Sequence, residues 1–201
     1  MAQTYHVKGT TFANTISAKL TIVSLSQNQL VFTFENTSSV ASKLTGIGFD
    51  FTNTGVFTNS GSVSPYTFID RPNNQSNNGN FNALKVPQYN GVTMDFALAL
   101  GGQFNGGGSP NAGLSAGQTS SQYTILSSTN SFSGITAAAL ANNVYIRFKA
   151  IGSNGQGSDV AHNLFTPSVA PVPEPGEYAV MGMIGLTLCG LMVRARRRKI
   201  A

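Results

Sequence analysis

The sequence predicts an all-β protein: an antiparallel β-sandwich or jelly-roll-like body at 1–165, followed by a C-terminal single transmembrane helix. Within the body, apolar and polar residues alternate in short segments, which is typical of strands with one buried face. Clusters of Gly, Asn, Ser and Thr, which favour turns over helices, separate these segments. Near the end of the chain, the uncharged apolar segment 178–193 has the composition of a membrane-spanning helix.

Seven or eight strands follow in chain order from this alternation. Leu20 and Ile22 fall on one face of the second segment, and Leu30, Phe32 and Phe34 fall on one face of the third. Because successive side chains of a strand point to opposite faces, we expect these residues to form the core. The strands are expected at 5–12, 19–26, 29–36, 44–51, 66–69, 91–100, 122–128 and 142–152.

The segments between the strands are predicted to be turns and loops, with one short helix. Residues 27–28 (Gln-Asn) form a tight turn between the second and third strands. The Gly- and Asn-rich stretches 71–82 and 101–113 are typical of long surface loops. The Ala-rich stretch 134–143 has the potential for two helical turns, whereas 153–163 has the Gly, Asn and Asp content of a turn.

Positive charge is concentrated at the C-terminal end. Only 9% of the residues are charged, against about 25% in an average soluble domain. Five of the basic residues lie within six positions near the end, and residues 1–168 carry seven Lys/Arg against five Asp/Glu. The clustered residues are Arg194, Arg196, Arg197, Arg198 and Lys199. Because a nucleic-acid-binding protein would spread its basic residues over a folded face, we expect no nucleic-acid partner.

The C-terminal region divides into three segments of different character. Four prolines in 166–176 favour an extended, stiff linker at 166–177. A helix over 178–193 would span about 24 Å, somewhat less than the roughly 30 Å of a hydrocarbon core. The basic residues of 194–201 are a positive-inside signal, which places this tail in the cytoplasm and the body across the membrane. A buried C-terminal helix is the alternative, although such a helix normally keeps a polar stripe.

Three features follow one another at the end of the chain: Val172-Pro173-Glu174-Pro175, the short Gly- and Leu-rich span, and the basic cluster. This pattern resembles the PEP-CTERM sorting signal of surface proteins in Gram-negative bacteria that produce exopolysaccharide. The resemblance implies that exosortase, an integral-membrane transpeptidase similar to Cys proteases, cuts near the Pro-Glu-Pro motif. It further implies an inner-membrane precursor with its body on the periplasmic side, and then a cell-surface or extracellular product. One departure is Gly176-Glu177, where members often carry a small hydroxyl residue.

The first eight residues are polar and lack the apolar core of a secretory signal peptide. Because the resemblance implies export, we expect a signal peptide to have been lost from this sequence by truncation. The body also resembles, in 35–51 and 146–159, domains commonly found before the sorting signal.

Few residues of the body point to chemistry. His6, His162 and Asp159 could together hold a metal, but their spacing matches no common metal motif, so we expect solvent-exposed or turn histidines and no metal or cofactor. Asp50 and Asp95 could supply the two carboxylates of a glycosidase, but we favour a role in keeping one sheet face soluble. The single cysteine, within the apolar span, excludes a Cys nucleophile in the body. We therefore assign no catalytic residue.

Tyr66, Tyr89 and Tyr123 lie near predicted loops and are candidates for stacking against sugar rings. The sequence therefore favours a non-enzymatic cell-surface or extracellular-matrix protein that exosortase processes and that is exported in association with exopolysaccharide. A carbohydrate-binding or adhesion module of the biofilm matrix is the alternative. An envelope glycan hydrolase or lyase is a third hypothesis.

Overall fold

The computed structural model of this chain describes residues 1–51, 55–71, 82–105 and 109–166. The chain divides into two units, 1–166 and 167–201. The expected linker beyond Thr166, the apolar span and the basic tail all belong to the second unit and lie outside the described residues. In the part that the structure describes, no helix combines the length and the apolar character needed to cross a membrane.

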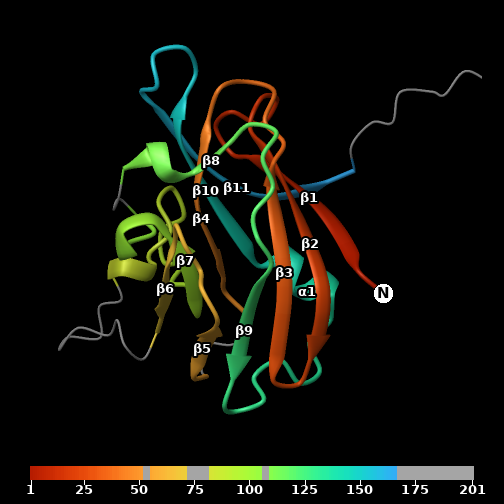
Figure 1. The fold of residues 1–201 in the computed structure, drawn as a ribbon. Helices are drawn as coiled ribbons and strands as arrows, with labels where there is room; N and C mark the ends of the chain where they lie inside the picture. Colours follow the sequence, from red (N-terminus) through yellow and green to blue (C-terminus); the bar gives the residue numbers. More distant parts are fainter. Residues whose placement is uncertain (52–54, 72–81, 106–108, 167–201) are drawn as a thin grey trace, which may run out of the picture. The chain divides into compact units, whose positions relative to one another are not determined.

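In the described residues, eleven strands form one antiparallel sheet that nearly closes on itself (Figure 1). Their order is β5-β9-β3-β2-β1-β11-β10-β4-β7-β6, with β8 paired to β4. The strands at the two ends of this order, β5 and β6, lie side by side. The predicted all-β, antiparallel class is confirmed. The strands are β1 (Gln3–Gly9), β2 (Ser17–Ser26), β3 (Gln29–Asn36), β4 (Lys43–Phe49), β5 (Phe57–Ser60), β6 (Thr67–Asp70), β7 (Phe96–Ala99), β8 (Leu114–Ser115), β9 (Tyr123–Ser127), β10 (Val144–Ile151) and β11 (Gly157–Phe165).

β2 and β3 form the predicted hairpin. Ser26 pairs with Gln29, which leaves residues 27–28 as the two-residue turn. Leu20 and Phe34 lie opposite each other in this register, and both are buried. The alternation of the two segments therefore identifies the face that contributes to the core.

Short helices connect some of the strands. The predicted helical turns of 134–143 are confirmed as α1, in which the Thr136 hydroxyl accepts a hydrogen bond of 3.1 Å from the Ala139 N–H group. This is the usual arrangement of an N-cap. The helices are α1 (Ala137–Asn142) and the 3₁₀ turns η2 (Asn82–Leu84), η3 (Leu100–Gly102) and η4 (Pro110–Ala112).

Some strands differ from the prediction. β5 and β8 lie where no strand was expected, and β11 occupies 157–165, where the composition favoured a turn over 153–163. Hydrogen bonds to β1 on one side and β10 on the other hold β11 in the sheet. Pairing with two neighbours thus overrides the weak strand propensity of Gly, Asp and Asn in this segment.

The sheet encloses a core that is rich in aromatic side chains. Phe96 of β7 is fully buried, and five other phenylalanine rings lie between 5.0 and 6.4 Å from its ring. These five are Phe49, Phe51, Phe57, Phe68 and Phe132. These six Phe residues therefore form one contiguous packing unit across several strands.

A second, smaller apolar cluster lies on the outer face of β4 and β7 and reaches β10 at Tyr145. Met94 packs over Gly48 and Phe104 packs over Gly46, so closely that a side chain at either glycine would meet them. As a result, β4, β7 and most of β10 are buried on both faces. The members of this cluster are Ile69, Leu84, Val86, Met94, Ala97, Ala99, Phe104, Tyr145 and Val160.

Candidate functional site

The predicted sorting residues lie outside the described residues. They comprise the motif Val172, Pro173, Glu174 and Pro175 and the basic cluster Arg194, Arg196, Arg197, Arg198 and Lys199. The structure therefore bears on the candidate residues of the body alone.

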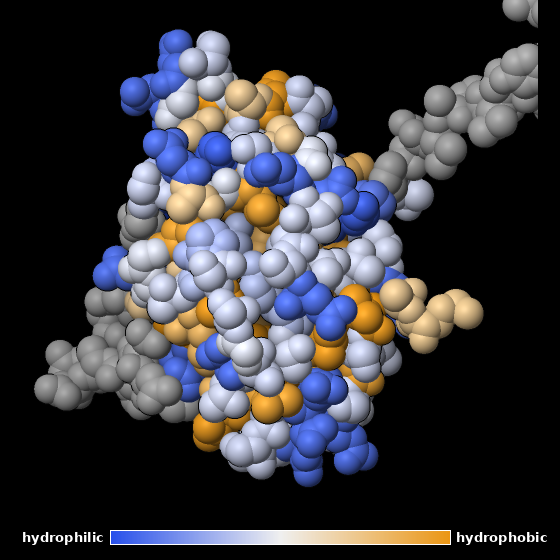
Figure 2. All heavy atoms as spheres, viewed as in Figure 1, coloured by the Kyte–Doolittle hydropathy of each residue, from blue (hydrophilic) through white to orange (hydrophobic). Residues whose placement is uncertain are grey.

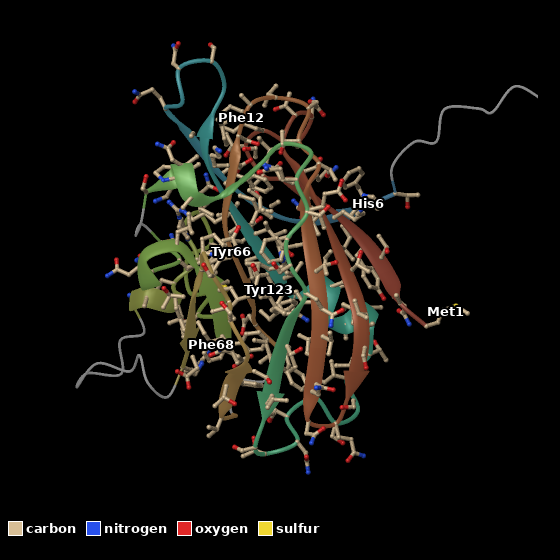
Figure 3. The ribbon with its side chains drawn as sticks, in the orientation of Figure 1. Met1, His6, Phe12, Tyr66, Phe68 and Tyr123 are labelled. Atoms are coloured by element: carbon tan, nitrogen blue, oxygen red, sulfur yellow. The ribbon has the colours of Figure 1, made fainter. Side chains whose placement is uncertain are left out.

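Two of the three candidate sugar-stacking tyrosines are in the core. Tyr66 is 5% exposed and Tyr123 is 2% exposed, and both point into the interior of the sheet (Figure 3). The Tyr66 hydroxyl donates a hydrogen bond of 3.1 Å to the Leu44 carbonyl, and the Tyr123 ring stacks on Phe34 at 5.6 Å. The expectation that these two rings are exposed is therefore wrong, because closure of the sheet buries the face on which they lie.

Tyr89, the third candidate, lies at the surface and is half-buried. Its hydroxyl is 2.6 Å from the Thr10 hydroxyl, which joins the 82–95 segment to the loop after β1. Its ring lies 5.3 Å from the rings of both Tyr145 and His162, edge-on to each. Tyr89 is thus part of a group of aromatic side chains from three segments distant in sequence.

Tyr145 of β10 and His162 of β11 form the base of this group. Their rings are parallel, with an interplanar angle of 3° and centroids 4.1 Å apart. The His162 Nδ1 atom lies 2.9 Å from the Val144 carbonyl oxygen, which fixes the orientation of the imidazole. We call Tyr89, Tyr145 and His162 the aromatic patch. The sequence offered one signal for Tyr145, its outward position in the alternation of 142–152, and none for its pairing with His162.

Asp50, which follows β4, adds a carboxylate near the aromatic patch. Burial raises the pKa of the Asp50 carboxyl, the nearby Asp95 raises it further, and Arg71 and His162 act in the opposite direction. The pKa of the Tyr145 hydroxyl is also raised, mainly by burial and then by the negative charge of Asp50. A half-buried carboxylate beside aromatic rings can accept hydrogen bonds from sugar hydroxyls while the rings contact the apolar face of a sugar.

Asp95 does not keep a sheet face soluble, because it is buried and only 1% exposed. One of its carboxylate oxygens accepts a hydrogen bond of 2.8 Å from the Phe51 N–H group. The other lies 3.7 Å from the Arg71 Nε atom. The sequence prediction for Asp95 is therefore wrong, and its carboxylate has a structural role at the end of β4.

Asp159, the carboxylate of the alternative metal site, also has a structural role. Asp159 accepts hydrogen bonds from the N–H groups of Thr11, Phe12 and Val160 at 2.9 to 3.1 Å. His6 packs against Phe165, with their rings 5.9 Å apart. Among the described residues, no group of three or more His, Cys, Asp or Glu side chains could hold a metal ion.

A groove of about 530 Å³ lies between the end of β2 and the loop before α1. It is lined by Ile22–Gln27 and by Phe132 and 134–137, together with Met1 and Gln3. Within the face shown in Figure 2, hydrophobic residues are scattered among hydrophilic ones. Scattered apolar side chains are normal on a protein surface, so this face defines no site. The residues that line the groove include no acidic, basic or histidine side chain, so the groove offers no candidate catalytic group.

Comparison of the chain with protein-family models, curated proteins and solved structures finds no match.

Proposed function

We propose that this chain is a non-enzymatic cell-surface or extracellular-matrix protein that exosortase processes at its C-terminal PEP-CTERM signal. The proposal rests on the order of the Pro-Glu-Pro motif, the uncharged span 178–193 and the basic cluster at the end of the chain. An apolar span holds a precursor in the membrane, and the arginines after it orient the precursor. The mature body is then exported in association with exopolysaccharide.

For the precursor we propose a single transmembrane helix at 178–193, with 194–201 in the cytoplasm and the body on the periplasmic side. For the body we propose a sandwich or jelly-roll-like architecture, in which two halves of the nearly closed sheet face each other across the aromatic core. The non-enzymatic role is supported by Asp95, whose carboxylate already serves Phe51 and Arg71. A hydrolase or lyase would need two carboxylates that are available to a substrate.

We expect co-expression with exosortase, behind an export signal, to shorten the chain and release the body from the inner membrane. Glu174→Gln should abolish this processing, because the substitution removes the charge of the recognised motif. Glu177→Gln, which removes an equal charge three residues later, is the matched control and should be processed normally. The measurement is immunoblotting of membrane and released fractions. Equal amounts of full-length, membrane-retained protein with and without exosortase would contradict the proposal.

A second function, carbohydrate binding by the body, is favoured by the aromatic patch beside Asp50. Replacing Tyr89 with Ala should lower retention of the protein on matrix polysaccharide by about tenfold or more. The variant loses both the stacking contact with the sugar and the exclusion of water around that contact. Tyr5→Ala, at another half-buried tyrosine in β1, is the control and should bind normally. Affinity electrophoresis measures the retention, and equal binding by the Tyr89 variant would exclude the patch.

A further inference from the structure

Arg147, in the middle of β10, is a buried cation. It is 9% exposed, and its Nε and Nη1 atoms are buried without a hydrogen-bond partner. The ion pairs found among the described residues do not include it. Burial lowers the pKa of the Arg147 guanidinium, and no acidic side chain among the described residues offsets this effect. An arginine nevertheless stays protonated at physiological pH.

The surroundings of Arg147 add positive charge. It pairs with Gly46 of β4 and Val160 of β11, so it lies between two neighbouring strands on the outer face of the sheet. Lys149, two residues further along β10, points to the same face and pairs with Lys43 of β4. The charge of Arg147 contributes to lowering the pKa of Lys149, after the larger effect of burial, so the two cations lie close enough to repel each other.

A buried guanidinium without an acidic partner is energetically costly, and a neighbouring cation increases that cost. An anion bound at this position would remove both penalties. We propose that the Arg147 guanidinium anchors an oxyanion site on the outer face of β10, and that its ligand is a carboxylate of an acidic sugar polymer. The choice of a sugar polymer rests on the proposed function, whereas the oxyanion site rests on Arg147 and its surroundings.

The position of the aromatic patch supports a sugar acid as the ligand. Tyr145 of the patch precedes Arg147 by two residues on the same face of β10, a separation of about 6.8 Å along a strand. This separation lies within the span of two linked sugar units. Tyr145 itself is 6% exposed, so a sugar would contact the patch at the half-buried Tyr89 and His162, whose rings pack against Tyr145. A carboxylate on the same or the next unit would then come near Arg147. The guanidinium has the planar fork of donors that matches a carboxylate.

The test uses the full-length chain in detergent, with glucuronate as the small probe and glucose as the neutral control, at constant ionic strength. Glucuronate should raise the melting temperature of the wild-type chain, because a ligand that binds the folded state stabilises it. Arg147→Met should melt no lower than the wild type without ligand and should not respond to glucuronate. Arg147→Lys should bind about tenfold or more weakly, since the fork is lost. Lys19→Met, an equal charge change on β2, should respond like the wild type.

Other results would overturn the site or the function separately. A lower melting temperature for Arg147→Met, with no response of the wild type to glucuronate, would make Arg147 a structural residue and overturn the site. An equal response to sulfate or phosphate would overturn the assignment to a sugar acid.

In a second arm of the experiment, the binding of polyglucuronate is compared with that of a neutral glucan. Binding of polyglucuronate that persists in Arg147→Met would overturn the site alone. Binding of glucuronate but not of polyglucuronate would overturn association with an acidic polysaccharide and leave the oxyanion site standing.

Discussion

Replacing Phe96 with Ala is expected to lower the free energy of unfolding by about 3–5 kcal/mol. Phe96 is fully buried in β7, and its ring lies among those of five other phenylalanines. Truncation removes the transfer free energy of the ring and leaves a cavity that rigid aromatic neighbours fill poorly. Because whole domains are stable by only about 5–15 kcal/mol, this one change should bring the body close to unfolding.

Denaturant unfolding followed by tyrosine fluorescence and far-ultraviolet circular dichroism measures this loss. Phe12→Ala is the matched control, because Phe12 is 38% exposed and should change stability by less than about 1 kcal/mol. A loss at Phe96 no larger than that at Phe12 would mean that the aromatic core is not packed as described.

Replacing Asp159 with Ala is expected to cost about 2–4 kcal/mol, the second largest effect on stability. Its carboxylate is 2% exposed and accepts hydrogen bonds from three N–H groups, two of them in the turn that follows β1. Without it, these donors lose a charged acceptor in a place where water enters poorly. The carboxylate also lies directly over Gly9, where any side chain would collide with it.

The measurement is again the free energy of unfolding, with two comparison variants. Asp159→Asn keeps one acceptor oxygen and should lose less than Asp159→Ala. Ser158→Ala changes the exposed residue next to it and should be close to neutral. Equal stability of Asp159→Ala and Ser158→Ala would show that the turn after β1 does not depend on this carboxylate.

Local patterns were sufficient to predict most of the strands. In the β2–β3 hairpin, alternation defines the buried face and residues 27–28 define the turn, and both depend on a few neighbouring residues. β11 was missed because its Gly, Asp and Asn disfavour strands locally, whereas its two partners, β1 and β10, are far away in sequence. The double burial of β4 could not be predicted either, because it depends on Met94 and Phe104 packing over its glycines.

The candidate site was less predictable than the fold for the same reason. Proximity to a predicted loop suggested exposed rings at Tyr66 and Tyr123, but closure of the sheet placed both in the core. Only the three-dimensional pairing of β10 with β11 brings Tyr145 onto His162. The burial of Arg147 has no signature in sequence, because both this burial and the lack of an acidic partner among the described residues depend on which strands lie beside it.

The most direct test of the proposed sorting is the mass of the body that is released when the chain is exported in cells with an active exosortase. Cleavage at the Pro-Glu-Pro motif predicts a product whose last residue falls within 172–176, with or without an attached group. A released or membrane-bound product that still extends to Ala201, or one that is cut elsewhere in the chain, would contradict the assignment of the C-terminal segment as a PEP-CTERM signal.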